Sequence, residues 1–292
     1  MKDFAFLNLH FIWKIKYVIV KHYHPHGSLS QIVTEYTLVA AFRTDGLSDI
    51  VAPFPPVPQQ SLYFYLNDPL KVIDENNTNQ VVIKPKALFV GTQISTKHLA
   101  LSSNHLMFYI NFYPGALHRL LKVSLSEFTD TDIDASFVLG ESVHLLLEKL
   151  TFSSSYDEIP KLVDQFLIKQ FNLLKPALPI DHAIHYLLKE DGNITMDTLA
   201  SMAFVSVRQM ERQFKERIGV PPKMYAKLIR FSKAYRMKEI NPFLTWTSIA
   251  HSCGYYDQMH LIRDFKTFTK MNPGSLEELI LITPYHLQSH LG

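Results

Sequence analysis

Four polar side chains recur at helical spacing in the last third of the chain: Arg208, Glu211, Arg212 and Lys215. Intervals of three, four and seven residues place them on one face of a helix. An arginine can bond guanine O6 and N7 together, and a glutamate can accept a hydrogen bond from cytosine N4. This face therefore has the chemistry to read base edges in the major groove of DNA. A plainer alternative stays open, in which Glu211 pairs with Lys215 on a solvated helix.

A second face of the same kind lies about fifty residues later and consists of Met259, Ile262, Arg263 and Lys266, with His260 beside them. Met259 and Ile262 are apolar at positions that are expected to point outward. Such a pair suits contact with thymine methyl groups, and it equally suits burial against another protein surface. We therefore expect the first face to carry most of the polar base readout and the second face to read less strictly.

Both faces belong to a sequence unit that occurs twice. The first copy contains Thr195, Leu199, Ala200, Ser206, Met210, Phe214 and Pro222, and the second contains Thr245, Ile249, Ala250, Tyr256, Leu261, Phe265 and Pro273. A helix, a tight turn and a second helix are the unit that places a recognition helix in the major groove. The pattern predicts helix-turn-helix one at about 195–218, a connecting helix at about 223–239 and helix-turn-helix two at about 245–269. The two recognition helices are expected to enter successive grooves of one duplex.

The charge distribution agrees with this prediction. The whole chain has a net charge of +2, but the stretch from Arg208 to Lys238 holds ten basic and two acidic residues. A local basic stripe suits phosphate binding, although an ordinary solvated helix face could also carry it. The predicted base contacts are Arg208, Gln209, Glu211, Arg212, Met259, His260, Ile262 and Arg263. The predicted phosphate contacts are Ser206, Lys215, Lys223, Lys227, Arg230 and Lys266, with Arg236 as a further basic candidate.

Over about residues 181–276 the sequence resembles the AraC/XylS family of bacterial transcription regulators. The matching positions are Leu199, Ala200, Ser206, Arg208, Gln209, Phe214, Lys215, Gly219, Pro222, Tyr225, Ile249, Ala250, Cys253, Gly254, Tyr255, Asp257, His260, Arg263, Phe265, Lys266 and Pro273. The resemblance implies a transcriptional regulator whose partner is double-stranded DNA.

The second copy departs from the family pattern at three positions. Lys270 stands where the family usually has glycine, which tolerates a left-handed backbone. Leu276 stands where an aromatic residue is common. Tyr256 replaces the usual small capping residue, so Asp257 becomes the predicted cap of the second recognition helix.

Residues 1–175 are predicted to form a separate N-terminal domain. Short apolar runs between turn residues favour β structure to about residue 130, in a sandwich or small barrel. The prolines of 53–58 are expected to lie outside any central strand. Helices follow at about 115–174, among them one over 137–150 and one over 159–174.

The linker is predicted at 175–179, ahead of a helical C-terminal domain over 180–292. Asp181 is expected to cap the first helix of that domain, and Pro221 and Pro222 to stop the first recognition helix. The expected fold is thus α+β and multidomain. The N-terminal part also faintly resembles a β domain that precedes AraC-type modules, which implies a cupin-like barrel that binds an effector or dimerises.

Composition narrows the remaining functions. The single cysteine, Cys253, excludes a disulfide within the chain and a cysteine-rich zinc site, and it favours a reducing compartment. The apolar start over 4–20 is interrupted by charged residues, so no membrane partner is expected and a cytoplasmic location is predicted. No Ser-His-Asp or Cys-His set and no phosphate-binding glycine loop can be recognised, so we predict that the protein is not an enzyme.

His22, His24 and His26 alternate as some metal ligands do, but Pro25 and Gly27 favour a loop, and no metal or cofactor is predicted. Two alternatives stay open for the N-terminal domain: a cupin-like metalloenzyme and a pure dimerisation module. A small-molecule effector, a second copy of the chain and RNA polymerase are further candidate partners.

Overall fold

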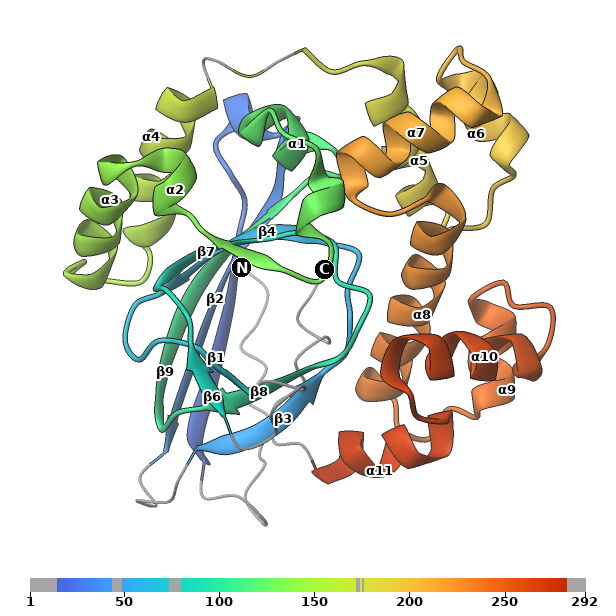
Figure 1. Ribbon diagram of the computed structural model, residues 1–292. Helices are drawn as coiled ribbons and strands as arrows, with labels where there is room; N and C mark the ends of the chain where they lie inside the picture. Colours follow the sequence, from blue (N-terminus) through green and yellow to red (C-terminus); the bar gives the residue numbers. More distant parts are fainter. Residues whose placement is uncertain (1–14, 44–48, 74–79, 172–173, 175, 283–292) are drawn as a thin grey trace.

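Figure 1 shows the computed structural model, which describes residues 15–43, 49–73, 80–171, 174 and 176–282. A β-rich N-terminal part and a helical C-terminal part lie side by side, so the expected fold class is confirmed. Residues 4–14 of the apolar start and Lys175 of the expected linker lie outside the described residues. None of the helices in the described ranges is both long enough and apolar enough to span a membrane.

The N-terminal part contains two antiparallel sheets. The strands are β1 (Ile15–Tyr23), β2 (Val33–Arg43), β3 (Ile50–Phe54), β4 (Gln60–Tyr65), β5 (Lys71–Ile73), β6 (Val81–Ile83), β7 (Ala87–Val90), β8 (Lys97–Leu101), β9 (Asn104–Phe112) and β10 (Asp132–Asp134). The larger sheet has the order β1-β2-β9-β4-β7-β10, and the smaller has the order β3-β8-β5-β6. Pro53 lies in β3, an edge strand, where its missing N–H breaks no central ladder.

Side chains of the larger sheet alternate between two buried environments. On β4, Leu62 and Phe64 pack toward the helices, whereas Tyr63 and Tyr65 line a cavity beside the smaller sheet. The neighbouring strands β7 and β9 alternate in the same way, so one face of the sheet builds a core and the other builds the cavity wall.

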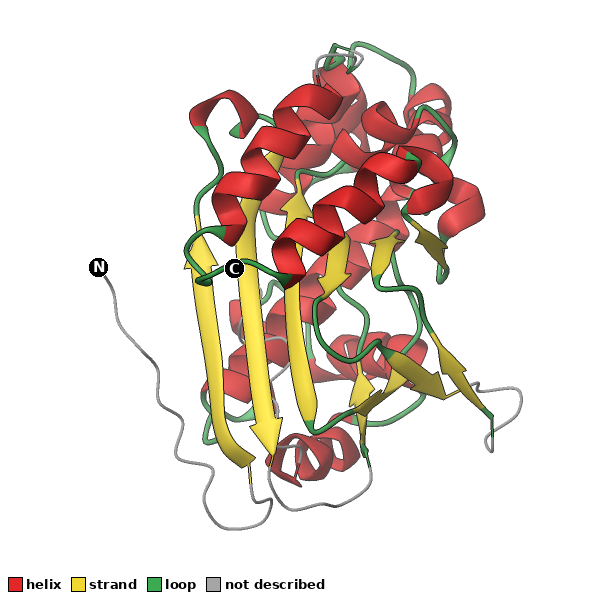
Figure 2. Ribbon diagram, turned by 90° about the vertical axis from the view of Figure 1, so that its left-hand side faces the viewer, coloured by secondary structure: helices red, strands yellow, loops and turns green. Residues whose placement is uncertain are grey.

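The N-terminal part also has four α-helices: α1 (Ala116–Leu121) between β9 and β10, and α2 (Ser136–Leu139), α3 (Glu141–Thr151) and α4 (Ile159–Phe171) after β10. Leu117, Leu146 and Val163 belong to the core that these helices share with the larger sheet, and Figure 2 shows helices lying across one face of the long strands. The single helix expected over 137–150 is wrong, because Gly140 interrupts it with φ 60° and ψ −151°. That conformation is open to glycine and disfavoured for other residues.

The C-terminal part is entirely helical in the described residues. Its elements are α5 (Pro179–Lys189), α6 (Met196–Met202), α7 (Val207–Ile218), α8 (Pro222–Ile240), α9 (Trp246–Ser252), α10 (Gln258–Thr269) and α11 (Pro273–Ile282). We refer to α6–α7 as HTH one and to α9–α10 as HTH two. Figure 1 shows α8 running between them.

Two expected helix boundaries differ from the structure. Asp181 does not cap α5; it is the third residue of that helix, and its Oδ2 accepts a hydrogen bond from the Leu178 N–H at 2.7 Å. Pro221 and Pro222 do not end α7, because Gly219 already ends it with φ 97°. Pro222 is instead the first residue of α8, where its fixed φ suits a helix and its missing N–H costs no hydrogen bond.

Both units share one hydrophobic core built around α8. Tyr225 of α8 packs edge-on against Phe214 of α7, with ring centroids 5.6 Å apart. Further along the same helix, Phe231 contacts Phe265 of α10, with ring centroids 4.8 Å apart. Because α8 packs against both α7 and α10 in this core, it sets the position of each recognition helix.

Candidate nucleic-acid interface

The two units start their helices in the same way. Thr195 and Thr245 cap the first helices, and Ser206 and Asp257 cap the recognition helices. In each case the side-chain oxygen accepts a hydrogen bond from the backbone N–H three residues later, at 2.8–3.3 Å. The predicted capping role of Asp257 is confirmed, and α7 and α10 both have 12 residues. Local capping thus aligns the two reading helices.

Each unit also contains two residues with a left-handed backbone. The turn before the recognition helix has Phe204 at φ 55° in HTH one and Gly254 at φ 74° in HTH two. The residue after the helix is Gly219 at φ 97° in HTH one and Lys270 at φ 60° in HTH two. Each copy therefore has a glycine at one of these positions and a side chain at the other.

The expected reading face of α7 is open to solvent. Arg208, Gln209, Arg212 and Lys215 are exposed and Glu211 is half-buried. Within the described part of the chain no ion pair joins Glu211 to Lys215. The face can therefore offer two guanidinium groups, a carboxylate and an amide to a duplex without first breaking an internal pair.

The face of α10 is less polar. Met259 is 55% exposed, Ile262 is half-buried and Arg263 is exposed. His260 is exposed as well, and its Nδ1 lies 3.0 Å from Asp257 Oδ1. The hydrogen bond from the His260 backbone N–H is the largest cause that lowers the pKa of Asp257, so this cap stays ionised at the start of the helix.

The basic stretch from 208 to 238 does not form one continuous surface. Five of its side chains have partners inside the domain. Arg217 forms a buried ion pair with Asp181, Lys238 pairs with the half-buried Glu277, Lys233 pairs with Asp191 at 2.6 Å, Lys227 pairs with Asp264 at 3.7 Å, and Arg230 donates to the Gly192 carbonyl at 3.0 Å. The reason is that α8 touches both units, so several of its basic side chains face inward; Arg236 is also half-buried. The exposed cations of this stretch are Arg208, Arg212, Lys215, Lys223 and Lys227, and HTH two adds Arg263, Lys266 and Lys270.

The last turn of α7 is held by the N-terminal domain. Its final carbonyl groups have no partner within the helix, and side chains from three N-terminal segments bind them. Thr92 Oγ1 donates to the Ile218 carbonyl at 2.5 Å, Thr129 Oγ1 to the Gly219 carbonyl at 3.0 Å, and Gln60 Nε2 to the Arg217 carbonyl at 3.4 Å. We call these three hydrogen bonds the α7-end contact.

Gly219 allows this close approach. A Cβ atom at this position would lie 2.7 Å from Thr129 Oγ1 and 2.8 Å from the Leu125 carbonyl oxygen. Real Cβ atoms do not come so close to such atoms, so a side chain here would push the N-terminal domain away. The matched residue in HTH two, Lys270, is exposed.

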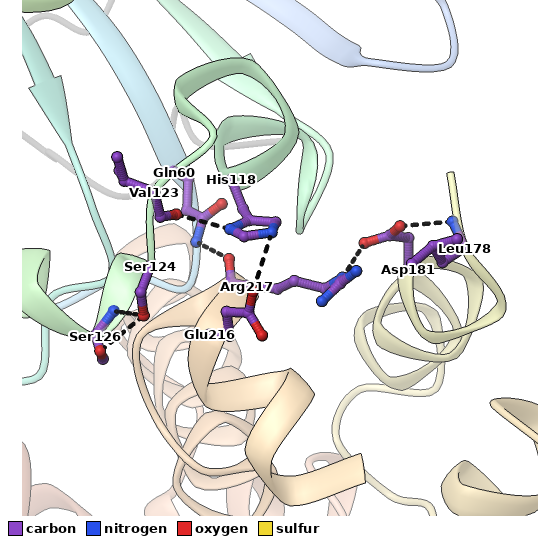
Figure 3. Close-up of polar contacts among 9 residues, drawn as sticks. All are labelled: Gln60, His118, Val123, Ser124, Ser126, Leu178, Asp181, Glu216 and Arg217. Atoms are coloured by element: carbon purple, nitrogen blue, oxygen red, sulfur yellow. Dashed lines mark hydrogen bonds and ion pairs between the residues drawn. The ribbon is translucent and has the colours of Figure 1, made fainter. Parts of the chain in front are cut away.

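A buried ion pair lies beside the α7-end contact (Figure 3). Arg217 Nε donates to Asp181 Oδ1 at 3.0 Å, and the two side chains are only 8% and 7% exposed. The pair joins α7 to α5, and a Cβ on Gly115 of the N-terminal domain would lie 2.7 Å from the same carboxylate oxygen. This pair was not predicted from the sequence. One signal could have indicated that Arg217 is buried: in the repeat, position 217 is equivalent to Phe268, which is a core residue of HTH two.

His118 adds a titratable group to the same interface (Figure 3). Its Nδ1 lies 2.7 Å from the Val123 carbonyl oxygen, and its Nε2 lies 3.8 Å from the carboxylate of Glu216 in α7. Burial is the largest cause that lowers the pKa of His118, and the nearby Arg217 lowers it further. The imidazole is therefore held in its neutral form near pH 7.

HTH two and α8 meet the N-terminal domain more sparsely. Thr96 Oγ1 donates to the Phe268 carbonyl at 3.2 Å, and Ile94 packs against the helical core. Tyr225 of α8 donates its hydroxyl to the Pro58 carbonyl at 3.0 Å.

A cavity of about 510 Å³ lies between the two sheets of the N-terminal domain. Tyr63 and Tyr109 stack in its wall with centroids 5.1 Å apart. Lys84 pairs with Asp132 at 2.8 Å in the lining. Burial lowers the pKa of the lining residue His105 to about 4, so this imidazole is neutral. The lining is thus mostly apolar and aromatic with a few polar groups, which is the composition of many ligand sites.

The histidines near the N-terminus do not converge. His22 Nδ1 lies 3.4 Å from Glu35 Oε2, while His26 bonds to Ser28, and both imidazoles are exposed together with that of His24. Among the residues that the structure describes, no three His, Cys, Asp or Glu side chains gather as a metal site would require.

Comparison with known proteins gives two family matches. Residues 199–278 match the model of a helix-turn-helix domain, and residues 21–134 match a domain of unknown function, DUF6597. A comparison with curated protein sequences gives no match.

Several solved structures are similar. ToxT from Vibrio cholerae O395 aligns over 81% of this chain and 95% of its own, with 13% identity and a TM-score of 0.45. The AraC-like transcriptional activator CuxR aligns over 75% and 81%, with 11% identity and a TM-score of 0.31. The DNA-binding domain of the global transcriptional factor AdpA, solved with a target DNA, aligns over 35% and 92%, with 21% identity and a TM-score of 0.33.

The helix-turn-helix match contains α7, α8, α9 and α10 and the second half of α6, so it includes both exposed reading faces described above. The chain carries a C-terminal domain of the AraC type behind a β-rich N-terminal domain. It is a DNA-binding transcriptional regulator.

Proposed function

We propose that this regulator reads a specific DNA sequence with both α7 and α10, and that a small molecule in the N-terminal cavity controls HTH one. The observation that carries the first part is the pair of exposed faces on two units that share one core and one capping pattern. Placed in successive major grooves, the two helices would lie about one duplex turn, or ~34 Å, apart.

The exposed groups divide into two kinds of contact. Arg208, Gln209, Glu211 and Arg212 can bond base edges from α7, while Met259, His260, Ile262 and Arg263 read from α10. Lys215, Lys223, Lys227 and Lys266 are placed to hold phosphates, and their contacts set register and affinity. Ser206 caps α7, and Arg230 is bonded to Gly192, so we give these two the weakest phosphate roles.

A selection of binding sites from random duplexes with the intact protein, followed by variants, tests this assignment. Arg212→Ala is expected to relax one base position and to lower the ratio of specific to random binding by roughly fivefold or more, since a good base contact is worth about 1–3 kcal/mol. Lys223→Ala is the control, because Lys223 is exposed, and a lost phosphate contact weakens all duplexes alike and lowers the salt slope by about one. An unchanged ratio for Arg212→Ala would remove α7 from base readout.

The proposed control of HTH one by a molecule in the cavity rests on two chain segments, 90–93 and 129–130. Each segment both lines the cavity and takes part in the α7-end contact. Val90 and Gln93 line the cavity, and Thr92 between them binds the end of α7. Asp130 lines the cavity, and the preceding Thr129 binds the next carbonyl of the same helix end. A molecule that shifts the cavity wall would therefore act on the position of α7.

The dye 1-anilinonaphthalene-8-sulfonate can test whether the cavity takes an aromatic molecule. We expect saturable fluorescence enhancement by native protein and a raised melting temperature, because a ligand that binds only the folded state stabilises it. Leu99→Trp fills the cavity from β8 and should remove the enhancement. Equal dye binding by both proteins would favour a dimerisation module without a sensor.

We propose a non-catalytic role for the N-terminal domain and a cytoplasmic location for the protein. A second copy of the chain and RNA polymerase are proposed as its protein partners, and cross-linking of the DNA-bound protein would test both.

A further inference from the structure

Phe204 combines two unfavourable features in the turn of HTH one. Its side chain is 85% exposed, and its backbone has φ 55°. The left-handed region is disfavoured for residues with a large side chain, and HTH two has Gly254 at the matched position. No burial of the ring offsets this strain within the folded chain. A strained residue that gains nothing from packing points to a role outside the fold.

The position of Phe204 indicates what the ring meets. It lies two residues before Ser206, the cap of α7, and its backbone N–H donates to the Ser201 carbonyl at 3.1 Å. The turn is therefore held in place at the end of α7 where the expected base contacts begin. The exposed charges that follow on α7 are Arg208 and Arg212, a local sign that favours a polyanion over a basic or apolar protein surface.

HTH two exposes an aromatic ring at the same end of its recognition helix. Tyr256 is 91% exposed and directly precedes the cap Asp257. Its ring meets the His260 ring edge-on, with centroids 6.0 Å apart. The turns differ by one residue in length and in the position of the aromatic residue, yet both units present an exposed ring just before the recognition helix.

We infer that Phe204 and Tyr256 are DNA-contacting residues that lie against the duplex at the edges of the two major grooves. This inference rests on the proposed DNA reading by α7 and α10. The Phe204 ring has no hydrogen-bonding group, so its contacts are apolar, and at the edge of the groove they are with deoxyribose carbons and thymine methyl groups. Tyr256 can add a hydrogen bond from its hydroxyl to a phosphate oxygen. Apolar contacts would thus frame the polar contacts of α7.

The test compares Phe204→Gly with Phe152→Ala in the intact protein. Glycine removes the ring and accepts the left-handed backbone, so we expect a melting temperature equal to or above that of native protein. Affinity for the selected duplex should fall roughly fivefold or more, a loss comparable with that of one base contact. Phe152 has the same exposed fraction, 85%, but lies at the end of α3 in the N-terminal domain. Its loss should leave DNA affinity unchanged.

A second measurement places the ring directly. The photoreactive residue p-benzoylphenylalanine, incorporated in place of Phe204 or of Phe152, should cross-link to the labelled duplex only from position 204. Unchanged affinity of Phe204→Gly together with no cross-link would overturn the inference, and a cross-link to a protein alone would do the same. If native protein selects no duplex at all, the proposed function itself fails, which is a distinct result.

Discussion

HTH one and HTH two have helices of the same lengths, helix caps of the same kind and a common core, yet HTH one makes far more contacts with the N-terminal domain than HTH two does. In HTH one the α7-end contact, a buried ion pair and a close glycine contact all lie within residues 216–219. In HTH two the matched residues are Phe268, which belongs to the hydrophobic core, and Lys270, which is exposed. A single hydrogen bond from Thr96 stands there in place of the three of the α7-end contact. The difference supports the proposal that the N-terminal domain acts on DNA binding through HTH one.

The largest expected effect comes from breaking the ion pair that HTH two lacks. Asp181→Ala leaves Arg217 buried without a partner, and we expect a loss of about 3–5 kcal/mol of folding stability. The double variant Asp181→Leu/Arg217→Met replaces both charges with apolar groups and should recover most of that loss. Denaturant unfolding of the three proteins measures this. Equal losses in the single and double variants would mean that the charges themselves are not the cause.

The next largest effect on stability is expected from substitutions at the residues that end α7 and α10, Gly219 and Lys270. Gly219→Ala places a methyl group against Thr129 and Leu125 at a positive φ, and we expect a cost of about 2 kcal/mol or more. Lys270→Gly relieves a left-handed residue in solvent and should be neutral or stabilising by up to about 1 kcal/mol. Melting temperatures of both variants decide the matter. If Gly219→Ala has the same melting temperature as native protein, the two domains do not approach each other closely at the end of α7.

The smallest expected effect is the part of the pH dependence that His118 contributes at the interface with HTH one. The folded protein lowers the pKa of His118 below its usual value of 6.5, so the unfolded chain takes up a proton first as pH falls. The stability that His118 contributes is fully present above pH 6.5 and is lost below it. His118→Gln should therefore show a shallower fall in melting temperature between pH 7 and pH 5 than native protein. Parallel curves would show that this interface does not titrate.

Local features were predictable where residues act within a few positions of one another. The cap at Asp257 depends on short-range geometry, and the structure bears it out. Asp181 was placed correctly near a helix start, but the cap lies three residues earlier, at Leu178, and Asp181 is the third residue of the helix. Gly140 broke an otherwise sound helical pattern, since periodicity counts apolar residues and not backbone angles.

What the sequence determined by itself is the existence of two helix-turn-helix units, because their repeat, caps and apolar spacing are all encoded within about 25 residues of each recognition helix. What only the tertiary structure decided is the use of the basic residues between 208 and 238. Arg217 and Lys238 are buried and Arg212 is exposed, although all three carry a positive charge at neutral pH. A charge reveals its role only through its neighbours, and the partners of Arg217 come from a helix 36 residues away and from a separate domain.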